Sequence, residues 1–366
     1  MADGAAETGK VRMARDLVRL SDVAKAAGVS QGTASNVFSR PDLVRPEVRE
    51  RVHQTARELG YAGPDPRGRL LRAGKSNAIG VATAEPLSYF FEDPFARVLM
   101  QGISEACDQR GAGLALVSAR NSERLAWNIQ SALVDGFVLL CIENGEKLVE
   151  LTRERQLPFV ALALGKPDET ISAIGVDDYA GAQMAARHLA QLGHRRFGIL
   201  AIEFDETHEG PVSGAEIAAA TYSTARDRAY GYFEELALYG VDRETIPIYE
   251  TRSTAESVRR GLEHILSGPQ RPTAILAMSD RVAMFALDML AERGISVPLD
   301  ISVVGFDGVP EAATASPPLT TVVQPIAEIG RRAVKTILEH DGGVHRESLP
   351  LELVFRRSTG APSARS

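Results

Sequence analysis

Short apolar segments alternate with amphipathic ones over most of the chain, from residue 78 to residue 306. The apolar runs are strand-like and form two series: 78–84, 113–118, 136–142, 158–164 and 173–176, then 195–201, 245–250, 273–278 and 301–306. Between them lie segments with helical periodicity, of which the clearest are 94–111, 180–192, 225–239, 255–266 and 281–293. Such alternation predicts doubly wound parallel sheets. Two series predict two α/β lobes with a cleft between them.

Individual residues mark the ends of these helices. Asp93 can cap the helix that begins at Pro94, because its carboxylate can accept from the free amides of the first turn. Gly193, Gly240 and Gly294 follow three of the helices in the position of C-terminal stops.

The composition is that of a globular protein with more than one domain. The chain has 366 residues, of which 44% are hydrophobic, so it can bury a sizeable core. It contains no apolar run of about 18 residues and no apolar signal-peptide region, so neither a membrane partner nor export is expected. Cys107 and Cys141 lack metal-ligand spacing. We therefore expect a cytoplasmic protein with no metal and no cofactor.

Positive charge is concentrated near the N-terminus. Residues 11–75 carry 13 Lys and Arg against 7 Asp and Glu, a net charge of +6, although the whole chain has a net charge of -7. A basic segment attached to an acidic body indicates a module that binds a polyanion. Charge alone leaves open a solvated surface with an uneven share of arginines, so the motifs must decide.

Residues 20–41, LSDVAKAAGVSQGTASNVFSRP, predict two short helices joined by a tight turn. Gly28 stands where a left-handed residue ends the first helix, and the Ser30 hydroxyl is placed to cap the second. The apolar residues of the first helix are spaced for one face: Leu20, Val23, Ala24 and Ala27. A third helix is expected from Pro46 to Gly60.

The outward face of the second helix has little bulk. It carries Gln31, Gly32, Thr33, Ser35 and Asn36, opposite an inward stripe of Ala34, Val37 and Phe38. A helix that enters the major groove brings its backbone close to the bases, where Gln and Asn can pair bidentately with adenine. The three helices therefore predict a helix-turn-helix DNA-binding domain. The alternative is a plain three-helix bundle, whose surface is usually richer in Lys and Glu.

Residues 20–61, with the runs DVAKAAGVS and RERVHQTARELGY, resemble the DNA-binding head of the lactose-repressor/galactose-repressor (LacI/GalR) family. The resemblance implies base contacts from Gln31, Gly32 and Asn36 and phosphate contacts from Ser30, Thr33 and Ser35. Gly32 has no side chain at a position that normally discriminates, and Asn36 replaces a frequent arginine, so the operator preference of other members does not transfer. Arg45 replaces a common capping Ser or Thr and is expected to contact a phosphate.

Residues 62–75, AGPDPRGRLLRAGK, predict a linker, because prolines and glycines interrupt any regular secondary structure in this segment. In the family a short hinge helix at this place folds on DNA and wedges a leucine between base pairs in the minor groove. By resemblance Arg69, Leu70 and Leu71 contact DNA, with Leu71 as the wedge, or Leu70 if the register shifts by one residue. A flexible tether is the alternative.

The resemblance extends over residues 18–360, through blocks such as DDYAGAQMAARHLAQLGHRRFGIL and DISVVGFDGVPEAATASPPLTTVVQP. It implies a two-lobed core like that of periplasmic binding proteins, with chain crossings near 176–177, 324 and 350. The expected division is a disordered tail (1–17), the helix-turn-helix domain (18–61), the hinge (62–75), an effector-binding and dimerisation core (76–361) and a tail (362–366). Within the core, the N-lobe comprises 76–176 and 325–349, and the C-lobe comprises 177–324 and 350–361.

Ligands of open parallel sheets bind beyond the carboxyl ends of the strands. Asp280 and Asp307 follow two such strands, and their carboxylates can accept hydrogen bonds from hydroxyl groups. By resemblance Arg228 grips oxygens of an effector, Phe95 forms an aromatic wall of the cleft, and Tyr89 lies in the preceding loop. The alternatives are an ordinary core role for Phe95 and an N-cap role for Asp280.

The motifs of several common enzyme classes are missing: there is no GxxxxGK[ST], no HExxH, and no GxGxxG after the first strand. We therefore expect a transcription regulator and not an enzyme, namely a homodimeric repressor that binds double-stranded operator DNA and a small-molecule effector, with a carbohydrate as the expected class. Two alternatives stay open. One is a corepressor-dependent regulator of the same fold that responds to a non-sugar metabolite. The other is a small-molecule-binding protein whose basic head does not bind DNA.

Overall fold

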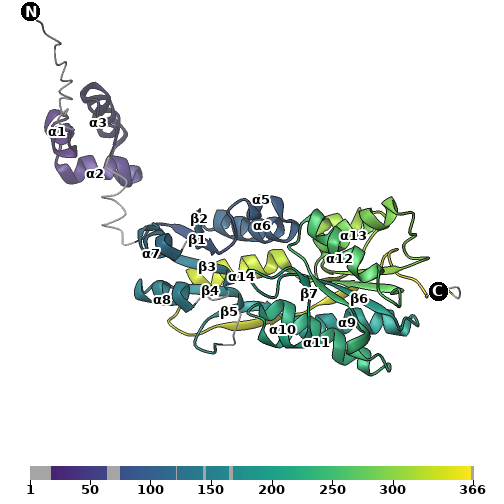
Figure 1. Cartoon of the computed structure of the whole chain (residues 1–366). Helices are drawn as coiled ribbons and strands as arrows, with labels where there is room; N and C mark the ends of the chain where they lie inside the picture. The colour runs from purple at the N-terminus through teal and green to yellow at the C-terminus, as the bar shows by residue number, and fades with distance from the viewer. Residues whose placement is uncertain (1–17, 64–74, 121, 143–145, 165–167, 364–366) are drawn as a thin grey trace, which may run out of the picture. The chain divides into compact units, whose positions relative to one another are not determined.

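The chain folds into two compact units, residues 1–76 and 77–366. The structure is a computed structural model that describes residues 18–63, 75–120, 122–142, 146–164 and 168–363 (Figure 1). The first unit is a helical head, and the second consists of two α/β lobes built on sheets of mainly parallel strands. This is the architecture predicted from the sequence, and it is confirmed.

The head contains three helices and a 3-10 turn: α1 (Leu20–Ala26), α2 (Gln31–Ser39), η1 (Pro41–Leu43) and α3 (Pro46–Leu59). Small apolar side chains form its core: Val23, Ala24, Ala27, Ala34, Val37, Val52 and Ala56. Gly28 and Gly60 end α1 and α3 in the left-handed region, with φ of 67° and 69°. The Ser30 hydroxyl accepts from the Thr33 amide at 3.0 Å. The turn and the caps predicted from the sequence are therefore confirmed.

The N-lobe is built on six parallel strands in the order β12-β5-β4-β3-β1-β2. Their bounds are β1 (Ala78–Thr83), β2 (Gly113–Ser118), β3 (Gly136–Ile142), β4 (Phe159–Leu164), β5 (Ala173–Val176) and β12 (Arg346–Leu349). The helices are α5 (Tyr89–Glu92), α6 (Pro94–Gln109), α7 (Ser122–Ser131), α8 (Glu146–Glu154) and α14 (Ile326–Leu338). Side chains of a strand alternate between its faces. In β3, Val138 and Leu140 join the cluster of α6 and α14, whereas Phe137 and Leu139 join that of α7 and α8.

Two glycines allow α6 and α14 to pack closely. A Cβ at Gly102 of α6 would overlap the Ala327 carbonyl, and a Cβ at Gly330 of α14 would lie 2.7 Å from the Leu99 carbonyl oxygen. Any larger side chain would push the two helices apart.

The C-lobe is built on seven strands in the order β13-β11-β10-β9-β6-β8-β7. Their bounds are β6 (Phe197–Ala201), β7 (Gly210–Pro211), β8 (Ile248–Glu250), β9 (Ala274–Ala277), β10 (Ser302–Asp307), β11 (Thr320–Val323) and β13 (Glu352–Val354). The inner strands are parallel, but the edge strands β7 and β13 are antiparallel to their neighbours. This mixed sheet differs from the all-parallel expectation.

Helices cover both faces of the C-lobe sheet, with α9 (Asp178–Gln191) and α11 (Ser223–Ala237) on one and α12 (Ala255–Leu266) and α13 (Asp280–Glu292) on the other. The predicted stops Gly193, Gly240 and Gly294 all have positive φ, and this prediction is confirmed. The sequence did not single out β7 or α10 (Gly214–Ala219), which lie between β6 and α11, nor the short turns η2 (Arg243–Thr245) and η3 (Pro310–Ala313).

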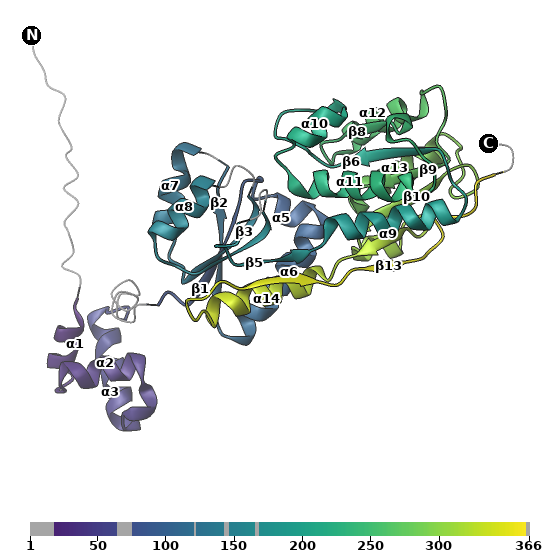
Figure 2. The ribbon, with the colours of Figure 1, turned by 90° about the horizontal axis from the view of Figure 1, so that it is seen from below.

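The chain passes between the lobes three times (Figure 2). It crosses between β5 and α9 at residue 177, between β11 and α14 at 324–325, and between β12 and β13 at 350–351. Within the described ranges, none of the helices combines the length and the apolar character that a bilayer span requires.

Candidate functional site

The exposed face of α2 carries the side chains that the sequence assigns to DNA. Gln31 and Gly32 are exposed in its first turn, and Thr33, Ser35 and Asn36 are partly exposed. The hydroxyl oxygens of Ser30 and Thr33 lie 2.8 Å apart at the N-terminal end of the helix. The amides and the dipole of a helix N-terminus favour anions such as phosphate.

Arg45 is exposed at the start of α3, where it is the N-cap residue but makes no side-chain capping hydrogen bond. The loss of a capping side chain, expected from the sequence, is thus confirmed. The three expected hinge contacts, Arg69, Leu70 and Leu71, lie outside the described residues, as do most of the hinge and the 1–17 tail.

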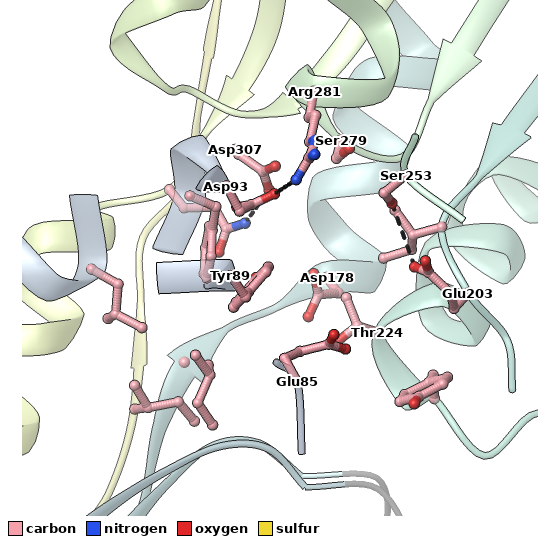
Figure 3. Close-up of a pocket in the computed structure, with 18 of the residues that line it drawn as sticks. Glu85, Tyr89, Asp93, Asp178, Glu203, Thr224, Ser253, Ser279, Arg281 and Asp307 are labelled. Carbon is pink, nitrogen blue, oxygen red and sulfur yellow. Dashed lines mark hydrogen bonds and ion pairs between the residues drawn. The ribbon is translucent and has the colours of Figure 1, made fainter. Parts of the chain in front are cut away.

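A cavity of about 410 Å³ lies in the cleft between the two lobes, a size suited to a small-molecule ligand. Residues from both lobes line it, and many of them follow the carboxyl ends of strands. Its apolar part includes Leu99, Leu140, Leu162, Ile174, Val176, Ile202 and Ile329. Figure 3 shows the polar groups, which project into the cavity from several separate segments of the chain.

Arg228, on α11, lines this cavity with its side chain almost completely buried. The guanidinium stacks on the Phe306 ring, 3.6 Å from the ring centroid. Its Nε donates to Asp178 Oδ1 at 2.8 Å, and its Nη1 donates to the Met278 carbonyl and lies 3.7 Å from Asp307 Oδ1. A planar guanidinium fixed between two carboxylates has a defined orientation. Arg228 is therefore positioned to interact with oxygens of a ligand.

Asp307, the last residue of β10, also lines the cavity. Its φ of 122° is rare for a residue other than glycine, and such strained positions cluster at functional sites. Gln324 Nε2 donates to Asp307 Oδ1 at 2.8 Å. Burial raises the pKa of Asp307 well above its ordinary value, although the charge of Arg228 acts in the opposite direction. Burial raises the pKa of Asp178 in the same way.

Asp280 is not among the residues that line the cavity, so the structure does not bring it to the predicted site. It is the first residue of α13, and its buried carboxylate accepts from the amides of Gly308 and Val309 at 2.7 and 2.9 Å and from the Thr321 hydroxyl at 2.5 Å. The N-cap prediction is wrong by one residue, because Ser279 Oγ accepts from the Val282 amide at 3.2 Å. Asp280 instead holds the loop that follows Asp307.

Tyr89 and Phe95 both line the cavity from the N-lobe, at the short helix α5 and at the start of α6. Phe95 also packs against the large apolar cluster of the core. Phe95 therefore lies in the wall of the cleft and also contacts the apolar core, so its position agrees with both interpretations.

Two ion pairs join α6 of the N-lobe to the C-lobe. Asp93 Oδ1 accepts from the Ala96 amide at 3.1 Å, which confirms the predicted cap, while its Oδ2 lies 3.0 Å from Arg281 Nη1 (Figure 3). Arg97 pairs with Glu311, which lies between β10 and β11. The contacts between the lobes thus include charged groups that can separate if the lobes move.

Sequence reasoning missed most polar residues of the cavity: Glu85, Asp93, Asp178, Glu203, Arg252, Ser253, Ser279, Arg281 and Gln324. One signal could have found four of them. Glu85, Glu203, Arg252 and Ser279 each stand two residues beyond the end of a strand, namely β1, β6, β8 and β9. Asp280 stands three residues beyond β9, where its side chain meets the neighbouring loop instead.

The described residues contain no group of three or more His, Cys, Asp and Glu arranged to hold a metal ion. Glu85 and Glu203 also line the cavity, and neither takes part in the ion pairs of Arg228 and Arg281. Both have a shifted pKa. Burial raises the pKa of both, that of Glu203 to about 7. The cavity can therefore offer donors from arginines, acceptors from carboxylates and an apolar wall.

The sequence and the fold are similar to those of known proteins. Residues 19–63 match the family described as bacterial regulatory proteins, lacI family, and residues 186–359 match a periplasmic binding protein-like domain. An HTH-type transcriptional regulator of Mycobacterium tuberculosis is 37% identical over 94% of this chain and 97% of its own length.

Two solved structures have the same two-part organisation. The lac repressor dimer bound to operator and the anti-inducer ONPF is 27% identical, with a TM-score of 0.74 over 94% of this chain and 99% of that one. The complex of the transcriptional regulator CelR with cellobiose is 28% identical, with a TM-score of 0.67 over 93% of this chain and 99% of that one.

Proposed function

Because the chain belongs to the lacI family of bacterial transcription regulators, we propose that it is a repressor whose operator affinity is controlled by a polyhydroxylated small molecule. Regulators of this family bind operator DNA and small effectors as dimers, and they are not enzymes. A regulator of bacterial promoters acts in the cytoplasm, and we propose that location for this protein.

The observation that carries the effector proposal is the fixed arrangement of Arg228 between Asp178 and Asp307 in the cavity. Carboxylates accept from hydroxyl groups, and a guanidinium donates to hydroxyl or ring oxygens. Tyr89 and Phe95 can cover an apolar face of a sugar ring. The similar regulator CelR has been solved with cellobiose, which supports a carbohydrate as the class of effector.

The position of the cavity suggests how such a ligand changes DNA binding. Both lobes contribute to its lining, so a ligand changes the relative energies of open and closed arrangements of the lobes. The ion pairs Asp93–Arg281 and Arg97–Glu311 stabilise one of these arrangements. The coupling is reciprocal, so operator DNA changes effector affinity by the same factor.

We assign the DNA contacts to the exposed face of α2 and to the hinge. Gln31, Gly32 and Asn36 read bases, and Ser30, Thr33, Ser35 and Arg45 contact phosphates, whereas Arg69, Leu70 and Leu71 enter the minor groove. Two heads of a homodimer would then read the two halves of a pseudo-palindromic operator.

The test uses the full-length protein and a random DNA library. Repeated selection should return a pseudo-palindromic sequence, and affinity for it should fall steeply with salt because phosphate contacts release counterions. Carbohydrates are then screened by thermal shift, since a ligand of the folded state raises the Tm by mass action. Each ligand found must change operator affinity. A protein that selects no sequence, or whose cavity ligands leave operator affinity unchanged, contradicts the proposal.

A further inference from the structure

More carboxylates than guanidiniums line the cavity. The acidic residues are Glu85, Glu92, Asp93, Asp178, Glu203 and Asp307, and the basic residues are Arg228, Arg252 and Arg281. Arg228 is paired with Asp178 and Asp307. Arg281 is paired with Asp93. The rest of the cavity therefore has an excess of negative charge.

Glu85 and Glu203 reach this acidic part from opposite lobes. Glu85 follows β1 and Glu203 follows β6, and Figure 3 shows both in the region of Asp178 and Thr224. In the part of the chain that the structure describes, neither carboxylate forms an ion pair. The Ser253 hydroxyl donates to Glu203 Oε2 at 3.5 Å, which is the outer limit of a hydrogen bond.

Arg252, the third guanidinium of the cavity, donates from Nη1 to the Asp205 carbonyl at 3.0 Å and not to either carboxylate. The charged groups that act on Glu203 are Glu85, Arg252 and Glu250, and those that act on Glu85 are Arg120, Asp93, Glu206 and Arg252. Burial has a larger effect than any of these charges on the pKa of both residues. Both carboxyls are therefore partly buried and lack a full counter-charge.

We propose that the ligand of this cavity carries a protonated amine that lies between the carboxylates of Glu85 and Glu203. The inference rests on the proposed function, and it narrows the polyhydroxylated effector to an amino sugar or another amine-bearing polyol. An ammonium group donates three hydrogen bonds, so it can bind both carboxylates at once, and its charge together with that of the nearby Arg252 offsets theirs when the lobes exclude water. A phosphate or carboxylate group would add negative charge to an acidic site, so sugar phosphates and sugar acids are rejected.

Binding of an ammonium group is coupled to the release of protons from the cavity. In the free protein, burial raises the pKa of Glu203 to about 7. The Glu203 carboxyl is therefore protonated in most molecules below neutral pH. A bound ammonium group favours the ionised carboxylates of Glu203 and Glu85, and binding therefore releases protons. Affinity should rise with pH toward neutrality and fall again when the amine itself loses its proton. A neutral polyol has no ammonium proton to lose, so its affinity should not fall at high pH.

The test compares matched ligands by calorimetry and thermal shift on the full-length protein. Glucosamine, galactosamine and mannosamine are each compared with the parent hexose, the N-acetyl form and the 6-phosphate. At least one amine should bind tenfold or more tightly than its neutral and phosphorylated counterparts, with proton release measured in buffers of different ionisation enthalpy. E203Q and E85Q should each reduce this preference at least threefold, because glutamine keeps the shape and removes the charge. E256Q, at an exposed carboxylate on α12, is the matched control and should keep the preference.

The outcomes separate this inference from the function on which it rests. If a carbohydrate binds and changes operator affinity, but its amine and neutral forms bind with equal affinity, the proposed amine recognition is wrong and the proposed regulator function stands. A preference unchanged in both E203Q and E85Q also overturns it. If no carbohydrate of any class binds, the proposed carbohydrate effector fails and the inference fails with it. The Tm of each variant without ligand shows whether a loss of binding reflects a loss of fold.

Discussion

At the scale of single residues, Arg228 is fixed before any ligand arrives. Phe306 supports its flat face, and Asp178 and Asp307 flank its nitrogen atoms. We expect Arg228→Ala to abolish the effector response, because the substitution removes a buried donor of the cavity. Operator affinity should stay unchanged, because Arg228 is in the core and not in the head. Breaking a buried ion pair is also expected to lower stability by about 3–5 kcal/mol.

The measurement is operator affinity with and without an effector found in the screen. Arg226→Ala is the control, because Arg226 is on the same helix and pairs with Asp227 without lining the cavity. An Arg228→Ala protein that responds at the wild-type effector concentration would remove this residue from the site.

Asp280 should matter for stability and not for ligand recognition. Asp280→Ala leaves two amides and one hydroxyl without their buried acceptor, at about 1–3 kcal/mol for each group. We therefore expect a loss of more than about 2 kcal/mol in the free energy of unfolding, measured by urea denaturation. Asp288→Ala, at an exposed position of the same helix, should change it by less than about 0.5 kcal/mol. Equal losses in the two variants would show that the buried network is unimportant.

The pKa of Glu203, raised to about 7 by burial, predicts a pH dependence of stability. The folded state keeps a proton that the unfolded chain releases near pH 4, so the stabilising contribution is complete below about pH 4 and is lost as the pH rises through 7. Glu203→Gln cannot ionise. Its Tm relative to wild type should therefore increase between about pH 5 and pH 8. A constant difference across this range would contradict the raised pKa.

The sequence indicated part of the candidate site for a physical reason. Asp307 was visible because it ends a strand, and Arg228 because its segment resembles the family. Glu203 and Arg252 were missed because their only signal is a position two residues beyond the ends of β6 and β8, and the residue type in a loop does not show whether the side chain faces solvent or a cavity. Asp280 was misplaced because one residue of register past β9 changes what its side chain meets.

At the scale of helices and strands, we expect α2 to read bases and the start of α3 to contribute general affinity for DNA. Asn36→Ala should relax the preference at particular operator positions, by roughly 1–3 kcal/mol if the contact is bidentate. Arg45→Ala should instead weaken all sequences about equally and reduce the slope of affinity against salt. Binding profiles over single-base operator variants test both. An unchanged profile in Asn36→Ala would assign base reading to other residues.

The head was predictable in detail because its signals are local. Gly28, Ser30 and Gly60 act through their own backbone or through an amide three residues away. The edge strands β7 and β13 were not predictable in this way. Each is short. β7 pairs with β8, and β13 pairs with β11, in both cases far away in the sequence, so no local periodicity indicates these strands.

At the scale of the whole molecule, Arg97–Glu311 joins the lobes without lining the cavity. Arg97→Ala should therefore change the balance between lobe arrangements and leave the ligand contacts intact. A partly exposed ion pair contributes about 0.2–1 kcal/mol, which corresponds to changes of up to about fivefold in affinity. Operator and effector affinities should both change, in opposite directions for an inducer and in the same direction for a corepressor.

Titrations of operator and effector on the same protein provide this measurement. Arg110→Ala is the matched control, since Arg110 pairs with Glu339 within the N-lobe at 2.9 Å. If Arg97→Ala leaves both affinities at the wild-type values, the ion pair does not bias the lobes.

The three crossings between the lobes also constrain how the protein can be made. β12 completes the N-lobe sheet, and α14 covers the face of the sheet on which α6 lies, yet both elements follow strands β6–β11 of the C-lobe in the chain. While residues 77–325 emerge, the side of α6 that packs against α14 and the edge of β5 that pairs with β12 have no partner. The N-lobe therefore cannot reach its final form before residue 349 has emerged, and a truncation before α14 would expose both surfaces to aggregation and proteolysis. Completion of the N-lobe fold thus depends on α14 and β12, which lie far in sequence from the head.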